Sequence, residues 1–177
     1  MSTRTIRQAY DMWPQYNGRL RDVIGAMTAE QLLVRPSPDR WPIWATVGHT
    51  AGMRVYWLCT VIGEPGLDTT PFSDDPTDGW EDHLDHPRSA EELVRALNST
   101  FTIVEGCLDR WTPEMLSDEI RREYQGSTQV HSRASILQAA LQPRCVPLRR
   151  AVPDAGHPRP AADRPLAHGL ITACSNS

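Results

Sequence analysis

The 177-residue sequence contains no lysine: all 18 of its basic side chains are arginine, set against 22 acidic residues and a net charge of −4. Affinity for nucleic acid comes mostly from neutralising phosphates, so an acidic chain of this kind argues against a nucleic-acid partner. We attribute the absence of lysine to the codon bias of a GC-rich genome rather than to function.

Long hydrophobic runs are also missing. No apolar run approaches the ~20 residues that a transmembrane helix needs, and residues 1–10 lack the apolar core of a secretory signal. We therefore expect a cytoplasmic protein without a membrane partner. The four cysteines contain no C-x-x-C pair and no spacing typical of zinc ligands, which argues against a disulfide framework or a zinc ribbon and favours buried or incidental thiols.

Two parts of the chain differ in composition. Residues 1–141 hold 13 arginines, 20 acids and all 12 aromatic residues, and they fall into periodic segments. Residues 142–177 hold five arginines, two acids, six prolines and no aromatic residue. We therefore divide the chain into a folded domain over 1–141 and an irregular Pro/Arg-rich tail over 142–177, because the tail has little apolar surface to offset the entropy of ordering it.

The first part is predicted to be helical. Apolar residues recur at helical spacing in three long segments, separated by proline, glycine and capping residues. Ser89 opens a capping-box pattern before the clearest segment, whose apolar stripe continues to Trp111. We expect helices over about 3–26 (divided at Pro14), 29–33, 43–62 and 90–111, a long acidic surface loop over 63–88, a polar connection through Gly126 and a helical stub from Ser132.

The stub defines the fold class. Pro143 and Pro147 follow it closely, and each proline inside a helix costs about 3 kcal/mol out of the roughly 5–15 kcal/mol that stabilises a domain. The helix is therefore predicted to end near Gln142. Three long helices and this stub indicate an all-α protein, a four-helix bundle with an incomplete fourth helix. The apolar faces that this leaves uncovered favour self-association.

Few residues could carry chemistry. His49 lies in the second long helix, where a lone histidine is interpreted first as a core residue satisfied by a hydrogen bond and second as a metal ligand. His83 and His86 lie three apart among four acids, which favours a solvated acidic face. His131 precedes the stub and is expected to be a cap or a surface residue. No nucleophile motif or phosphate-binding loop is present, so chemistry in residues 1–141 rests on His49 alone.

Several motifs follow one another in a recognisable order. They are the run RPSPDRWPIWATVGHTAGMRVYWLCTVIGEPG, the segments SAEELVRAL and LDRWTPEML, and the HSRASILQ entry to a fourth helix. Over residues 1 to about 141 this order resembles the DinB-like superfamily of bacterial four-helix bundles. The resemblance implies a divalent metal, zinc or nickel, held by three histidines: one on helix 2, which His49 matches, and an H-x-x-x-H pair on helix 4.

The resemblance also implies an activity. Members of the family include thiol-dependent transferases and isomerases and presumed metal-dependent hydrolases, so the substrate would be a small molecule or a low-molecular-weight thiol. Three imidazoles leave an open position on the metal for water or a thiol, and the metal then acts as a Lewis acid or lowers the pKa of that ligand.

The helix-4 histidine pair is missing where the resemblance places it. It should follow ILQ within a few residues, and no histidine stands there. Back-translating residues 142–166 with GC-compatible codons and reading one nucleotide later gives, for one permitted choice of codons, an H-x-x-x-H followed by Gly-Glu. We hypothesise a one-base insertion or deletion between about Ile136 and Gln142, which would also explain the loss of aromatic residues and the onset of prolines.

The sequence therefore predicts a DinB-family protein of uncharacterised substrate, derived from a divalent-metal-dependent hydrolase or thiol S-transferase. His49 is its sole predicted metal ligand. Because one histidine cannot hold zinc against water, we expect the chain as written to retain no metal and to be inactive. Two alternatives stay open: an intact enzyme, if the restored reading frame is the true one, and a non-catalytic helical interaction module whose tail docks on a partner.

Overall fold

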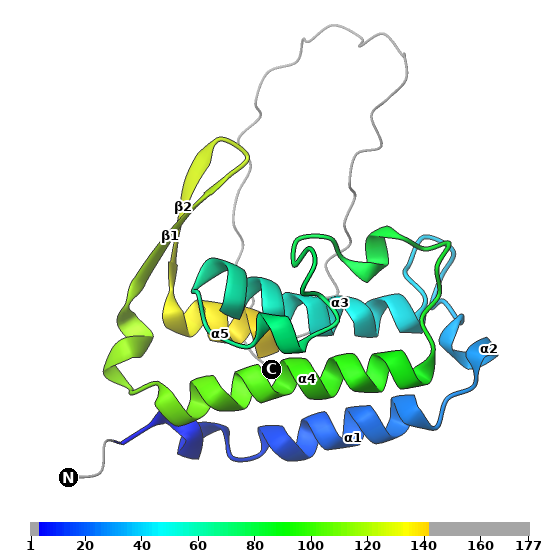
Figure 1. Cartoon of the computed structure of the whole chain (residues 1–177), viewed down its shortest axis with the longest axis horizontal. Helices are drawn as coiled ribbons and strands as arrows, with labels where there is room; N and C mark the ends of the chain where they lie inside the picture. Colours follow the sequence, from blue (N-terminus) through cyan, green and yellow to red (C-terminus); the bar gives the residue numbers. More distant parts are fainter. Residues whose placement is uncertain (1–3, 142–177) are drawn as a thin grey trace, which may run out of the picture. The chain divides into compact units, whose positions relative to one another are not determined.

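The computed structural model describes residues 4–141; the predicted tail over 142–177 and the predicted helix end near Gln142 lie outside this range. The described chain is mostly helical, with one small antiparallel sheet (Figure 1). None of its helices combines the length and apolar character that a membrane span requires. In chain order the elements are η1 (Ile6–Tyr10), α1 (Trp13–Gly25), α2 (Ala29–Leu32), α3 (Ile43–Val55), the π-helical turn η2 (Tyr56–Val61), η3 (Leu67–Thr69), η4 (Trp80–Asp82), α4 (Ala90–Arg110), η5 (Glu114–Ser117), β1 (Glu119–Tyr124), β2 (Ser127–Ser132) and α5 (Arg133–Leu141).

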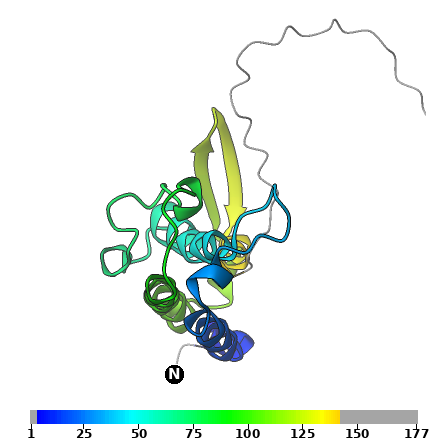
Figure 2. The same cartoon turned by 90° about the vertical axis from the view of Figure 1, so that its right-hand side faces the viewer.

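Four helices form a bundle in which α4 packs against both α1 and α3, and α5 packs against α3 (Figures 1 and 2). Helices α1 and α5 run in one direction, α3 and α4 in the other (Figure 1). Contacts at the helix ends fix these directions. The backbone N–H of Ile6 donates to the carbonyl of Trp111 at 2.9 Å, and Glu64, just after η2, bonds to Arg110 at the end of α4. Because α3 and α4 are consecutive and parallel, a long connection must join them.

Local sequence signals account for the helix boundaries. Thr28 and Ser89 each open a complete capping box, and the one at Ser89 was predicted. Pro14 lies in the first turn of α1, where its missing N–H costs nothing, so the predicted segment 3–26 divides there into η1 and α1. The predicted helix over 43–62 is present as α3 followed by η2. The helical fold class is thus confirmed for the described residues.

The prediction of a surface loop over residues 63–88 is wrong in part. This segment is the crossover that returns the chain to the start of α3, and it buries Phe72, Trp80 and Glu81. The rings of Phe72 and Trp80 lie with centroids 4.9 Å apart, and η4 packs against α3. The many acids and prolines of the segment predicted exposure. Phe72 and Trp80 nevertheless hold it against α3, because burying their large apolar rings is favourable.

The predicted polar connection through Gly126 is a β-hairpin. Strands β1 and β2 pair antiparallel and in register from end to end. The turn residues Gln125 and Gly126 have φ values of 50° and 75°, as a two-residue turn of type I′ requires at both positions. The hairpin extends away from the helices (Figure 1), and it adds a small sheet to a fold that was expected to be all-α.

Contacts with η2 hold the hairpin to the bundle. The Arg122 guanidinium lies 4.6 Å from the Trp57 ring centroid and donates a hydrogen bond to the Tyr56 hydroxyl. His131, expected as a cap or a surface residue, is instead half-buried in β2 with its ring 5.2 Å from that of Trp57. Since a two-stranded hairpin is marginal in water by itself, these contacts are needed to stabilise it.

Helix α5 corresponds to the predicted stub. Its first residue, Arg133, pairs with Glu64 at 3.6 Å and with Asp118 at 3.3 Å, and only 14% of the Arg133 side chain is exposed. The inward face of the helix is apolar, formed by Ile136, Leu137, Ala140 and Leu141. The stub is therefore fastened to the bundle at its start and buried along one face.

Candidate functional site

His49 lies in the middle of α3, with 13% of its side chain exposed. Its Nδ1 lies 2.6 Å from Oε1 of Glu81 on η4, and the Trp41 ring contacts the imidazole at a centroid distance of 5.0 Å. Glu81 is 9% exposed, and its second oxygen, Oε2, is buried without a hydrogen-bond partner. Histidines that bind metals or act as bases commonly have one ring nitrogen bonded to a carboxylate in this way.

Two glycines on one face of α3 let the crossover approach the helix. A Cβ atom on Gly48 would lie 3.2 Å from the Trp80 ring, and one on Gly52 would lie 3.5 Å from the Phe72 ring. Because residues four apart share a helix face, the two rings lie side by side along α3. The close contact at Gly48 brings η4, and with it Glu81, to the turn of the helix that carries His49.

A third glycine makes room for the carboxylate itself. A Cβ atom on Gly79 would lie 2.5 Å from the carboxyl group of Glu81, closer than real contacts allow. Sequence reasoning missed Glu81, since it was one acid among many in an acidic segment. The glycine and tryptophan directly before it were the available signal, because they mark a close approach of backbone to a neighbouring element.

The other candidate histidines do not join His49. His83 lies 2.9 Å from Asp78 and His86 lies 3.3 Å from Asp85, and both imidazoles are well exposed. The structure thus agrees with a solvated acidic surface in this segment. The remaining two histidines, His157 and His168, lie outside the described residues.

The described thiols are not activated nucleophiles. Cys59 and Cys107 are both buried and unpaired with another cysteine. Burial, with a further contribution from the Glu64 carboxylate, raises the pKa of Cys59 to about 11 and that of Cys107 to about 12. Reactive cysteines have a pKa below the ordinary value, so these two side chains are structural.

The described residues do not complete a metal site around His49. Within residues 4–141, no group of three or more His, Cys, Asp or Glu side chains is placed to hold a metal ion. Zinc sites use three protein ligands when catalytic and four when structural. The inward face of α5, on the helix where the resemblance places the other two imidazoles, is formed by apolar residues as far as Leu141. The donor set of the described chain therefore does not fit the metal of the family.

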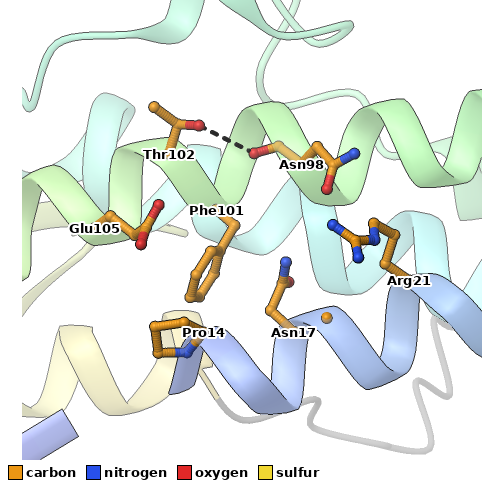
Figure 3. Close-up of a pocket in the computed structure, with 8 residues that line it drawn as sticks. Pro14, Asn17, Arg21, Asn98, Phe101, Thr102 and Glu105 are labelled. Atoms are coloured by element: carbon orange, nitrogen blue, oxygen red, sulfur yellow. Dashed lines mark hydrogen bonds between the residues drawn. The ribbon is translucent and has the colours of Figure 1, made fainter. Parts of the chain in front are cut away.

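A pocket of about 270 Å³ lies elsewhere, between α1 and α4 (Figure 3). The side chain of Asn17 points into it from α1, while the charged groups at its rim are engaged, Arg21 with Asp22 and Glu105 with Arg7. The lining is formed by Pro14, Asn17, Gly18, Arg21, Asn98, Phe101, Thr102 and Glu105. Since His49 is not among these residues, the pocket and the His49–Glu81 pair are separate features.

The arrangement defines a class of protein: a four-helix bundle with a long crossover, whose second long helix carries a partly buried histidine bonded to a carboxylate. Comparison with protein families places the chain within that class. The DinB superfamily matches residues 15–142, and the chain belongs to this superfamily, as the motif order predicted. No curated protein and no solved structure gave a significant match.

Proposed function

We propose that this chain is a DinB-superfamily bundle derived from a divalent-metal-dependent hydrolase or thiol S-transferase, and that it has lost its metal centre and is inactive as written. The observation that carries the proposal is the isolation of His49. Its carboxylate partner is present, but the buried residues of α5 are all apolar as far as Leu141. Metal affinity depends on several ligands held in place together, so one imidazole retains neither zinc nor nickel.

The direction of α5 supports the reading-frame hypothesis. The helix begins beside Glu64 and runs antiparallel to α3, from the end of η2 toward the beginning of α3 (Figure 1). In the shifted reading the H-x-x-x-H falls at positions 143 and 147, seven residues after Ile136 and Ala140. Seven residues are about two helical turns, so a helix continuing α5 in that frame would carry both imidazoles on its buried face.

The metal content of two purified proteins tests the proposal. One is the chain as written, and the other is its frame-restored counterpart, with one base deleted between codons 136 and 142 so that the codons from 142 onward are read one nucleotide later. Each is incubated with zinc or nickel, freed of excess metal by desalting, and analysed by inductively coupled plasma mass spectrometry. We expect no stoichiometric metal in the chain as written and about one ion per chain in the restored protein.

A His49→Ala variant of each protein is the matched control. It should remove the metal from the restored protein and change nothing in the chain as written. One tightly bound ion per chain in the protein as written, lost in the His49→Ala variant, would overturn the loss of the metal centre. A folded restored protein that binds no metal would overturn the proposed ancestry.

A further inference from the structure

We propose that Glu81 is a positioning residue that fixes the tautomer of His49, so that the imidazole presents Nε2 as a free lone pair even in a chain without a metal. The inference rests on the proposed function in one respect: in the parent enzyme, the Nε2 lone pair would bind the metal. The tautomer itself is a property of residues 49 and 81 and can be measured independently of metal binding.

The chemistry of the pair decides which ring nitrogen carries the proton. An ionised carboxylate only accepts hydrogen bonds, and Oε1 of Glu81 lies 2.6 Å from Nδ1 of His49. Nδ1 must therefore be the donor. In the neutral imidazole the other nitrogen, Nε2, then holds the lone pair. Within residues 4–141 no hydrogen bond reaches Nε2, so no partner in this part of the chain competes for its lone pair.

Docking of the crossover does not by itself account for a buried glutamate. Phe72 and Trp80 already attach the segment to α3 through their contacts with Gly52 and Gly48. Glu81 adds a buried carboxylate whose Oε2 has no partner, and leaving a buried polar atom unsatisfied costs about 1–3 kcal/mol. Local costs of this kind are typical of functional sites. The feature that the carboxylate adds is its bond to His49.

The backbone around Glu81 is shaped for the same contact. Gly79 leaves the space that the carboxyl group fills, since a Cβ atom there would lie 2.5 Å from it. Gly48 brings Trp80 against α3 in the turn that bears His49. The crossover thus brings the Glu81 carboxylate to the Nδ1 atom of the His49 imidazole, across 32 residues of sequence.

Long-range ¹H–¹⁵N correlation NMR of the histidine side chains tests the inference on the full chain as written. His49 is assigned by its disappearance in a His49→Gln variant, and spectra are recorded at a pH at which the imidazole is neutral. We expect the pattern of an Nδ1–H tautomer for His49. In Glu81→Met, which keeps the length of the side chain but removes the acceptor, we expect the population to shift toward Nε2–H.

Glu91→Met is the matched control. Glu91 is exposed in the first turn of α4, so this variant makes the same chemical change at a glutamate that does not bond to His49 and should leave the His49 pattern unchanged. An Nε2–H tautomer in the unmodified chain, or an imidazolium pattern that persists to pH 8, would overturn the inference even if Glu81→Met failed to fold. Metal retention by the chain as written would instead contradict the proposed function and leave the tautomer result standing.

Discussion

Glu64 accepts a hydrogen bond from the indole Nε1 of Trp111 at 2.8 Å, across 47 residues of sequence. The same carboxylate also binds Arg110 and lies 3.6 Å from Arg133. Only 12% of the Glu64 side chain is exposed. One side chain therefore joins the end of η2, the end of α4 and the start of α5, and it anchors the stub of the fourth helix.

Replacing Glu64 by glutamine should destabilise the domain. The amide can still accept from Trp111, but Arg110 loses its charged partner and the largely buried Arg133 keeps only Asp118. Hydrogen bonds to charged groups contribute about 1.5–3 kcal/mol each, so we expect a loss of roughly that size. Urea unfolding followed by circular dichroism measures it. The exposed Glu91→Gln serves as the control, and equal stability of the two variants would contradict the anchoring role.

Gly79→Ala should displace Glu81 from His49, because the new Cβ atom would lie 2.5 Å from the carboxyl group. The flexible end of the Glu81 side chain is the part that can move. We expect the His49 NMR pattern to change as in Glu81→Met while the helical content is retained. An unchanged pattern would show that the carboxylate accommodates the methyl group without leaving Nδ1.

Gly18→Ala is the contrasting variant for that experiment. Gly18 is helical, and an added Cβ atom there meets no other atom within 4 Å. Alanine loses less conformational entropy than glycine when a helix forms, so this variant should be more stable by about 0.5–1 kcal/mol. Its His49 pattern should match that of the unmodified chain, and a change there would indicate an effect transmitted through the bundle.

Replacing Arg54 by methionine should stabilise the protein. Arg54 is 2% exposed, and no acid within residues 4–141 pairs with it. Its guanidinium donates to the carbonyl of Leu97 at 3.2 Å and to Thr100 at 3.5 Å, its Nε has no partner, and burial lowers its pKa to about 10. Replacing buried charges by well-packed apolar side chains is often stabilising by about 1–4 kcal/mol.

The comparison of Arg54→Met with Arg54→Ala separates charge from packing. Alanine removes the same charge but leaves a cavity, so it should be less stable than methionine by about 2 kcal/mol or more. Thermal and urea unfolding measure both variants. A methionine variant less stable than the unmodified chain would show that the stacking of Arg54 on Phe101 and its hydrogen bonds outweigh the cost of burying the charge.

The two buried thiols should make the protein sensitive to alkali. Their pKa values are raised from 9.0 to about 11 in Cys59 and about 12 in Cys107. Well below pH 9 the thiols are neutral in both folded and unfolded chains. Between pH 9 and pH 11 the unfolded chain loses its thiol protons while the folded chain keeps them, so the free energy of unfolding falls as the pH rises.

A Cys59→Ala, Cys107→Ala double variant isolates this effect. Its free energy of unfolding should fall less steeply between pH 9 and pH 11 than that of the unmodified chain, although it starts lower because two buried sulfur atoms are lost. Urea titrations at several pH values give the two slopes. Parallel slopes would assign the alkaline sensitivity to groups other than these two thiols.

Much of the helical framework could be predicted from the sequence, because its signals are local. The capping boxes at Thr28 and Ser89 and the apolar stripe of α4 depend on residues three or four apart. The hairpin was missed because its strands are short and polar, and its stability comes from the contacts of Arg122 and His131 with Trp57 on η2. No local rule anticipates those contacts.

The candidate site was predicted only in its first member. His49 was found from its place in the motif order, whereas Glu81 lies 32 residues later in a segment whose composition predicted solvent exposure. What joins the two is the parallel packing of α3 and α4, which forces the intervening chain back along the bundle. The sequence by itself determined where the long helices lie and which histidine is the candidate metal ligand. The tertiary structure decided which carboxylate meets that imidazole, because such a contact depends on the path of the whole crossover and not on neighbours in the chain.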